Sequence, residues 1–124
     1  MSVFGPILSG VAVGGDGEAT ANTDTTHPVK GLIAQIDITY HDSPPAETTD
    51  VIIATKGKNA PALTILTVSN SATNGSYPVR VEEVDNTGSG QSAYTPLVVD
   101  DYINVKIDDA NAGDYVKVYL HMVD

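Results

Sequence analysis

Apolar and polar residues alternate in short runs along most of this chain, and glycine, proline, asparagine and aspartate separate the runs. In the clearest run, residues 31–41, every second residue is apolar: Leu32, Ala34, Ile36, Ile38 and Tyr40. Side chains at alternate positions share one face of a β-strand, so these five are predicted to face a core. No run has the 3.6-residue spacing of an amphipathic helix. The pattern therefore predicts an all-β protein.

Five further strands are predicted after this run, at residues 49–56, 63–70, 76–84, 97–108 and 114–123. Asn74-Gly75 is the strongest turn signal between them, because both residues tolerate positive φ. Pro78 indicates an edge position or a bulge in its strand, and residues 85–93 are predicted to form a long loop. Each strand has one apolar face and no helix to cover it, so the strands must form two packed sheets. We predict a small, jelly-roll-like β-sandwich.

The first thirty residues differ in composition from the rest of the chain. They combine small apolar residues with several glycines and a stretch rich in threonine, asparagine and aspartate, which ends at Pro28. This composition argues against a self-sufficient fold. We therefore divide the chain into an extended N-terminal arm, residues 1–30, and a sandwich domain, residues 31–124. The alternative is that the apolar residues of the arm form the first strand of the same sandwich.

Charge and composition narrow the possible partners. Sixteen acidic and six basic residues give this chain of 124 residues a net charge of −10. Such a charge repels phosphates and anionic lipid headgroups, so we expect neither nucleic acid nor a membrane as a partner.

The absence of cysteine excludes disulfides and thiolate metal sites, and it suits assembly in a reducing cytoplasm. The N-terminus lacks the pattern of a secretory signal. A core of this modest size favours oligomerisation.

The residues that carry chemistry do not form a catalytic pattern. His27, His41 and His121 lack the local spacing of a zinc site. Ser89 lies between glycines but lacks the strand-to-helix context of a nucleophile elbow. Acid pairs such as Asp100-Asp101 do not match a calcium-binding loop motif, although a structural calcium ion held by loop carboxylates stays open as an alternative. We predict no catalytic residue, no cofactor and no metal ligand, and expect that the chain is not an enzyme.

A family resemblance rests on the order of several segments: Tyr40-His41-Asp42, then residues 49–55, 70–80, 99–105 and 113–119. In this layout, which covers residues 31–124, the chain resembles the short jelly-roll cement, or head-decoration, proteins of tailed bacteriophages. The resemblance implies a structural virion protein that is assembled in the host bacterial cytoplasm. It also implies a homotrimer that binds the major capsid protein on the outer capsid surface, at three-fold and quasi-three-fold sites, and stabilises the head.

Apolar residues of the arm are the first candidates for contact with a neighbouring subunit. There are six of them: Val3, Phe4, Ile7, Leu8, Val11 and Val13. They would add a strand to the neighbour or pack on it. Tyr77, Arg80 and Tyr102 are further interface candidates, because tyrosine and arginine are enriched at interface hot spots. The structural alternative is a packed tyrosine or a solvated arginine at each position.

Two other functions stay open. Small β-sandwiches often bind sugars on exposed aromatic rings, and five tyrosines are candidates here: Tyr77, Tyr94, Tyr102, Tyr115 and Tyr119. Tyr115 and Tyr119 fall on one face of one predicted strand, whereas the lack of tryptophan argues against a sugar platform. A carbohydrate-binding or adhesive module is therefore one alternative. A tail, baseplate or fibre-tip component is the other, because it would have the same composition as a decoration protein.

Overall fold

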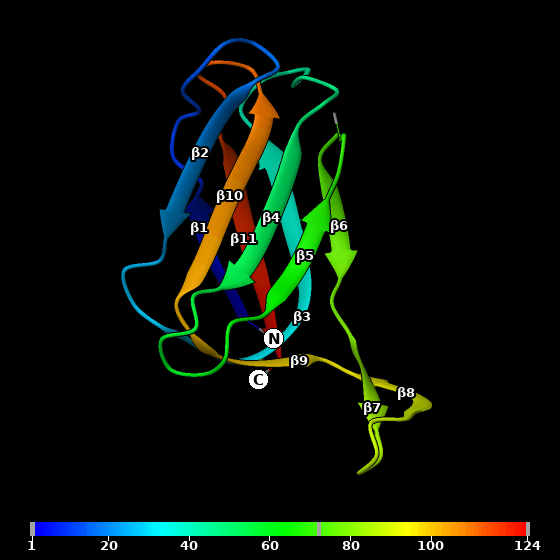
Figure 1. Cartoon of the computed structure of the whole chain (residues 1–124). Helices are drawn as coiled ribbons and strands as arrows, with labels where there is room; N and C mark the ends of the chain where they lie inside the picture. Colours follow the sequence, from blue (N-terminus) through cyan, green and yellow to red (C-terminus); the bar gives the residue numbers. More distant parts are fainter. Residues whose placement is uncertain (1, 72, 124) are drawn as a thin grey trace.

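The chain forms β-strands joined by turns and loops (Figure 1). The structure is a computed structural model, which describes residues 2–71 and 73–123. Within these ranges eleven strands and no helix occur, which confirms the all-β prediction. No helix long and apolar enough to span a membrane is found in this part of the chain.

One sheet is antiparallel and contains five strands: β1 (Ser2–Leu8), β3 (Val29–Tyr40), β6 (Gly75–Pro78), β9 (Leu97–Asp101) and β11 (Val116–Val123). Their order is β1–β11–β3–β6, and β9 also pairs with β3. The length of β3 allows both pairings, because β9 lies beside residues 29–33 and β6 lies beside residues 35–38. β3 and β11 therefore occupy the middle of this sheet.

The second sheet covers the apolar face of the first (Figure 1). Its four strands, in spatial order, are β2 (Ala19–Asp24), β10 (Ile103–Ala110), β4 (Asp50–Thr55) and β5 (Thr64–Val68). Buried positions alternate along β4, β10 and β11, as expected when only one face of each strand is packed. The two layers confirm the predicted β-sandwich.

The core consists almost entirely of aliphatic side chains. The largest fully buried side chains are the aliphatic Ile33, Ile36, Ile38, Ile53, Ile103, Ile107, Leu120, Val51, Val105, Val116 and Val118, and the polar Thr49. Each buried isoleucine or leucine contributes about 1.5–3 kcal/mol relative to an exposed one. β-Branched side chains also fit a pleated surface well, so the same residues favour strands and fill the core.

A bulge in β3 changes which of its residues face the core. Ala34 is an extra residue where β3 pairs with β11, and the alternation of side chains shifts there. Ile33 is consequently buried, whereas Leu32 and Ala34 are only half-buried. The prediction that Leu32 and Ala34 face the core is therefore wrong, and the later part of the predicted face is buried as expected.

The first thirty residues contribute strands to both sheets. β1 is an edge strand beside β11, and β2 is an edge strand beside β10. Ile7 and Ala19 are buried in the common core. Gly5 permits the close approach of β1 to β11, since a Cβ at this position would lie 2.7 Å from the carbonyl oxygen of Val118. In place of an extended arm, this segment takes the alternative arrangement, because its backbone adds an edge strand to each sheet, although of its six predicted contact residues only Ile7 is buried.

Two of the predicted strands are interrupted. The strand predicted at 76–84 divides into β6 and β7 (Val81–Val84), because the chain leaves the sheet after Pro78, which has no N–H to donate. The strand predicted at 97–108 divides into β9 and β10 at Tyr102. The predicted loop at 85–93 contains a turn and the start of β8 (Gly90–Thr95), which pairs with β7. This β7–β8 hairpin projects away from the sandwich (Figure 1).

Candidate ligand-binding face

The outer face of the five-stranded sheet carries a continuous set of polar and aromatic side chains along β3 and β11. These side chains alternate with buried ones, so they point away from the core. We call the set the polar ladder, and its four opposed pairs are Gln35 with His121, Asp37 with Tyr119, Thr39 with Lys117, and His41 with Tyr115. Successive pairs are two residues apart, so the ladder is roughly 20 Å long.

Asp37 is the centre of a hydrogen-bond network on the polar ladder. Its carboxylate accepts a hydrogen bond from Gln35 Nε2 at 2.9 Å and lies 2.7 Å from His121 Nε2. Ser76 of β6 also hydrogen-bonds to this carboxylate. Burial raises the pKa of Asp37, but the hydrogen bonds from Ser76, His121 and Gln35 outweigh burial and hold the pKa below its ordinary value. Asp37 is therefore a fixed anionic acceptor.

The opposite end of the polar ladder forms a shallow pocket. The rings of His41 and Tyr115 are stacked, with centroids 4.5 Å apart and an angle of 13° between their planes. Together with Thr39, Tyr40 and Lys117 they line a cavity of about 170 Å³. The exposed ammonium of Lys117 supplies hydrogen-bond donors beside the stacked rings. This end of the ladder offers flat ring surface next to a cation.

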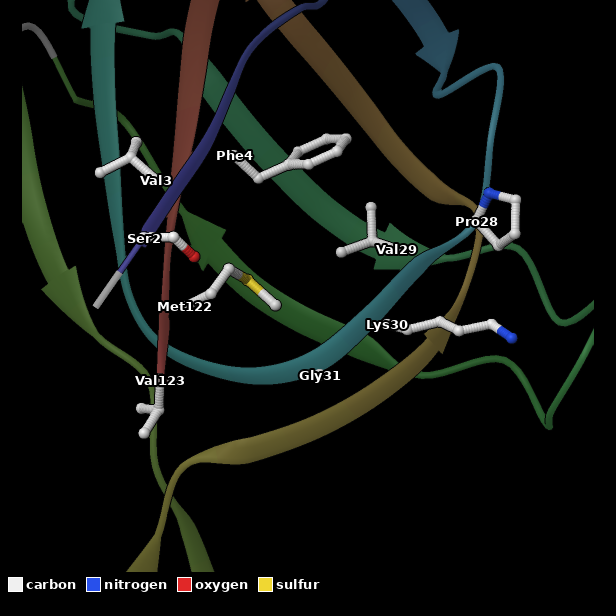
Figure 2. A pocket seen from close by; sticks show the side chains of 9 residues that line it. All are labelled: Ser2, Val3, Phe4, Pro28, Val29, Lys30, Gly31, Met122 and Val123. Atoms are coloured by element: carbon white, nitrogen blue, oxygen red, sulfur yellow. The ribbon is translucent and has the colours of Figure 1, made fainter.

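A larger cavity, of about 300 Å³, opens at the end of the sandwich where β1, β11 and the start of β3 meet (Figure 2). We call it the end cavity. Its apolar lining includes Val3, Phe4, Val29 and Met122, and Lys30 is the charged residue of the lining. The end cavity is thus a hollow with both apolar and polar lining and a lysine at its rim.

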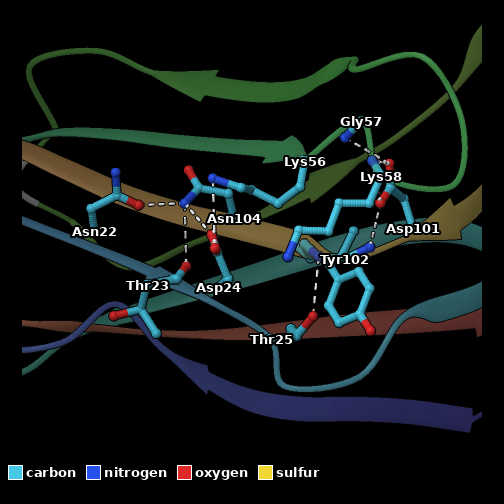
Figure 3. Close-up of polar contacts among 11 residues, drawn as sticks. Asn22, Thr23, Asp24, Thr25, Lys56, Gly57, Lys58, Asp101, Tyr102 and Asn104 are labelled. Carbon is cyan, nitrogen blue, oxygen red and sulfur yellow. Dashed lines mark hydrogen bonds and ion pairs between the residues drawn. The ribbon is translucent and has the colours of Figure 1, made fainter.

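Tyr102, predicted as an interface residue, belongs to a cluster that holds a loop in place (Figure 3). The neighbouring Asp101 accepts backbone hydrogen bonds from Gly57, Lys58 and Tyr102. Burial raises the pKa of Asp101, but these backbone hydrogen bonds outweigh burial and lower the pKa. The Lys58 ammonium lies 4.7 Å from the centroid of the Tyr102 ring. The half-buried Tyr102 ring thus contacts Lys58, and its contact with another subunit stays a prediction.

The six apolar residues predicted as arm contacts have two different environments. Ile7 is buried in the core. The other five are exposed: Val3, Phe4, Leu8, Val11 and Val13. Phe4 and Leu8 also line an open hollow beside residues 23–26 of the second sheet. Contact of these five with a neighbouring subunit stays a prediction.

The remaining aromatic and basic candidates are scattered. Tyr77 is half-buried and packs against the core, and Arg80 is exposed where the chain leaves β6. Tyr94 is exposed on the β7–β8 hairpin. Tyr115 and Tyr119 share the polar ladder, as the predicted strand face indicated. The five candidate tyrosines therefore do not form one platform, and two of them lie together.

Histidine and acidic side chains are the possible metal ligands of this chain, which has no cysteine. Within residues 2–71 and 73–123, no three or more histidine, aspartate or glutamate residues are grouped so as to hold a metal ion. His41 and His121 lie at opposite ends of the polar ladder. His27 is exposed in the loop between β2 and β3.

Comparisons with known proteins give matches among solved structures. A scan against protein-family models and a search of curated proteins return no match. Among solved structures, a mutant of a carbohydrate-binding module of family 29 aligns with TM-score 0.42, 14% identity, and coverage of 89% of this chain and 66% of that chain. A CBM29-2 mutant complexed with cellulohexaose gives TM-score 0.41, 14% identity and coverage of 89% and 66%.

A further similar structure is CBM32-3 from a family 31 glycoside hydrolase from Clostridium perfringens. It aligns with TM-score 0.38, 14% identity, and coverage of 94% of this chain and 74% of that chain. The chain spans slightly less than two thirds of the length of the family 29 modules that it matches, at 66% or below.

Proposed function

We propose that this chain is a non-catalytic domain that binds carbohydrate, and that the polar ladder is its binding face. The observation that carries the proposal is the ladder itself, in which polar and aromatic side chains from the two central strands form opposed pairs on one outer face. The core residues between them fix their positions, so the face is organised before a ligand arrives.

The side chains of the polar ladder match the chemistry of a sugar. Sugar hydroxyls donate and accept hydrogen bonds, and the Gln35 amide, the Asp37 carboxylate and the Lys117 ammonium supply both kinds of partner. The rings of Tyr115 and Tyr119 supply apolar surface for the C–H faces of a sugar ring, and each ends in a polar hydroxyl. Because the groups follow the strand direction for roughly 20 Å, the ladder suits an extended glycan chain.

The acidic content of the polar ladder favours binding over hydrolysis. Most enzymes that cleave glycosidic bonds use two carboxyl groups that flank the bond. Asp37 is the one carboxylate among the eight ladder residues. Its hydrogen bonds from Gln35, Ser76 and His121 keep it ionised, whereas a general acid needs a raised pKa. The ladder thus fits recognition without catalysis.

Isothermal titration calorimetry tests this proposal, with oligosaccharides selected from a glycan array. Tyr119→Ala and Gln35→Ala should each weaken binding by about three- to tenfold, because one ring contact or one hydrogen bond contributes about 1 kcal/mol. Tyr94→Ala on the hairpin and Thr67→Ala on the other sheet are matched controls, and both should bind as the native chain does. Absence of glycan binding, or ladder variants that bind like native protein, would refute the proposal.

A second candidate function is decoration of a virion, as the family resemblance implies. In this proposal the chain is a homotrimer that binds the major capsid protein on the outer surface of a phage head. The projecting β7–β8 hairpin and exposed apolar residues such as Val3, Leu8 and Val13 favour it, since exposed apolar surface is typical of protein contact sites.

Electron cryomicroscopy of the virus that encodes the chain tests the second candidate. Density for the sandwich at three-fold and quasi-three-fold positions on the head is the expected result. Density on the tail, baseplate or fibre would favour the other structural role that the sequence left open. Absence of the chain from purified particles would contradict both structural roles.

A further inference from the structure

We propose that the β7–β8 hairpin of one molecule binds the end cavity of a second copy of the same chain. This inference does not depend on carbohydrate binding, because it uses neither the residues nor the face of the polar ladder. It assigns a role to two features that the proposed function leaves unused: the projecting hairpin and the apolar hollow beside β1.

The hairpin lacks cover from its own sandwich. Val81, Val84 and Tyr94 are 42%, 59% and 56% exposed. An isolated two-stranded hairpin is at best marginally stable in water, so a contact that buries these side chains would stabilise it. Its turn is nevertheless well defined, because the Asp85 carboxylate accepts hydrogen bonds from the backbone N–H groups of Thr87 and Ser89. The hairpin is therefore a preformed projection with apolar side chains to bury.

The end cavity complements the hairpin in polarity and charge. Val3, Phe4 and Met122 supply apolar lining, and Lys30 supplies a positive charge in a chain whose net charge is −10. The hairpin segment, residues 81–95, contains three acidic residues and no basic residue. An acidic, partly apolar projection thus matches a partly apolar hollow with a lysine at its rim.

The size and position of the end cavity favour a contact between two molecules. Its volume of about 300 Å³ is at the lower limit for ligand pockets, and it suits one or two inserted side chains such as Tyr94. The hairpin extends from β9 away from the body of its own molecule (Figure 1), so it does not cover the end cavity of its own chain. The two surfaces differ, and repeated contact between different surfaces gives closed rings or reciprocal dimers.

Sedimentation equilibrium of the full chain, over a range of concentrations, is the first test. We expect an associated species whose mass is a multiple of 12.9 kDa. The double variant Val84→Ser with Tyr94→Ser should raise the dissociation constant at least about tenfold, since two apolar contacts are lost. Leu63→Ser is the matched control, because Leu63 is an exposed apolar residue that lies outside both surfaces and outside the predicted arm contacts. A native chain that is monomeric at every concentration overturns the proposal.

Disulfide cross-linking then identifies the contact, and the absence of native cysteine makes it specific. Differently tagged single variants, Tyr94→Cys and Phe4→Cys, are mixed and oxidised, and we expect a covalent heterodimer. The pair Tyr94→Cys and Leu63→Cys serves as control and should cross-link at least about tenfold less, because the Cα atoms must lie within roughly 7 Å. Equal cross-linking of both pairs, or none in either, contradicts this contact and leaves the carbohydrate proposal unaffected.

Discussion

Asp37 illustrates how single residues on the sheet face are prepared for binding. Its side chain is 29% exposed, so water and a ligand can reach it. Three neighbours from three strands, Gln35, Ser76 and His121, point donors at it. A ligand that displaces water from Asp37 therefore meets groups whose orientation is already fixed, which lowers the entropic cost of binding.

The lowered pKa of Asp37 predicts a specific pH dependence of stability. Its contribution is present above the unfolded-state pKa, near 3.8, and is lost as the pH falls through the lower folded-state pKa. Asp37→Asn should reduce the free energy of unfolding by about 1 kcal/mol at neutral pH, and this difference should shrink as the pH falls below 3.8. Urea denaturation at a series of pH values measures it.

Asp100→Asn is the control for this experiment, because Asp100 is an exposed aspartate outside the polar ladder. This variant should follow the native curve of stability against pH. A stability difference for Asp37→Asn that stays constant between neutral and acidic pH would show that ionisation of Asp37 is not the cause.

The polar ladder could be predicted only in part from the sequence. Alternation places Gln35, Asp37 and Thr39 on one strand face, and it places Lys117, Tyr119 and His121 on the outward face of another. It does not say that the two strands are neighbours, because Asp37 and His121 are 84 residues apart in the chain. The hydrogen bond between them follows from the sheet order, which local periodicity does not encode.

At the scale of elements, the position of β1 decides whether the N-terminus stabilises the sandwich. Ile7 and Leu8 are adjacent in β1, yet Ile7 is 6% exposed and Leu8 is 47% exposed. Ile7→Ala should lower the free energy of unfolding by about 2–3 kcal/mol, because it removes core contacts and leaves a cavity. Leu8→Ala should cost less than about 0.5 kcal/mol. Chemical denaturation of both variants gives the comparison.

Equal and small effects of the two substitutions would mean that β1 does not pack on the core in solution. The segment would then be the extended N-terminal arm that the sequence predicts for residues 1–30, and its apolar residues would be available to a neighbouring subunit.

Strands were predictable where one face is buried without interruption, as in β4 and β11. They were not predictable where a local irregularity changes the pattern. The bulge at Ala34 moves Leu32 off the core face. Both residues are apolar, so their residue types do not indicate a bulge at this position. The six residues of β8 are all exposed, so β8 lacks the periodic signal that identifies a strand. Its first four residues were assigned to a loop for this reason, whereas β7 lies within the strand predicted at 76–84.

At the scale of the whole molecule, the sandwich separates two surfaces of different character. The polar ladder lies on the outer face of the central strands, whereas the hairpin and the end cavity lie toward the end that holds both chain termini (Figure 1). Self-association through the end would leave the ladder of each copy exposed. An assembly that carries several polar ladders would then bind a repetitive surface more tightly than a single molecule does. After the first ladder binds, the others are held close to the surface at a high effective concentration.

This separation predicts that the hairpin can be removed without loss of the fold. The described core residues stop at Val79 and resume at Leu97, and Val81 pairs with Thr95 at the base of the hairpin. Replacement of residues 82–94 by Asn-Gly would close the chain with a two-residue turn suited to antiparallel strands. The melting temperature should change by less than about 4 °C, corresponding to less than about 1 kcal/mol.

The same variant should bind oligosaccharides with the affinity of the native protomer and should be monomeric in sedimentation equilibrium. Calorimetry with a short oligosaccharide is the appropriate measurement, because a short ligand contacts one ladder and excludes avidity. A large drop in melting temperature would show that the hairpin belongs to the folding unit of the sandwich. Retained self-association would show that β1 or another edge, rather than the hairpin, joins the copies.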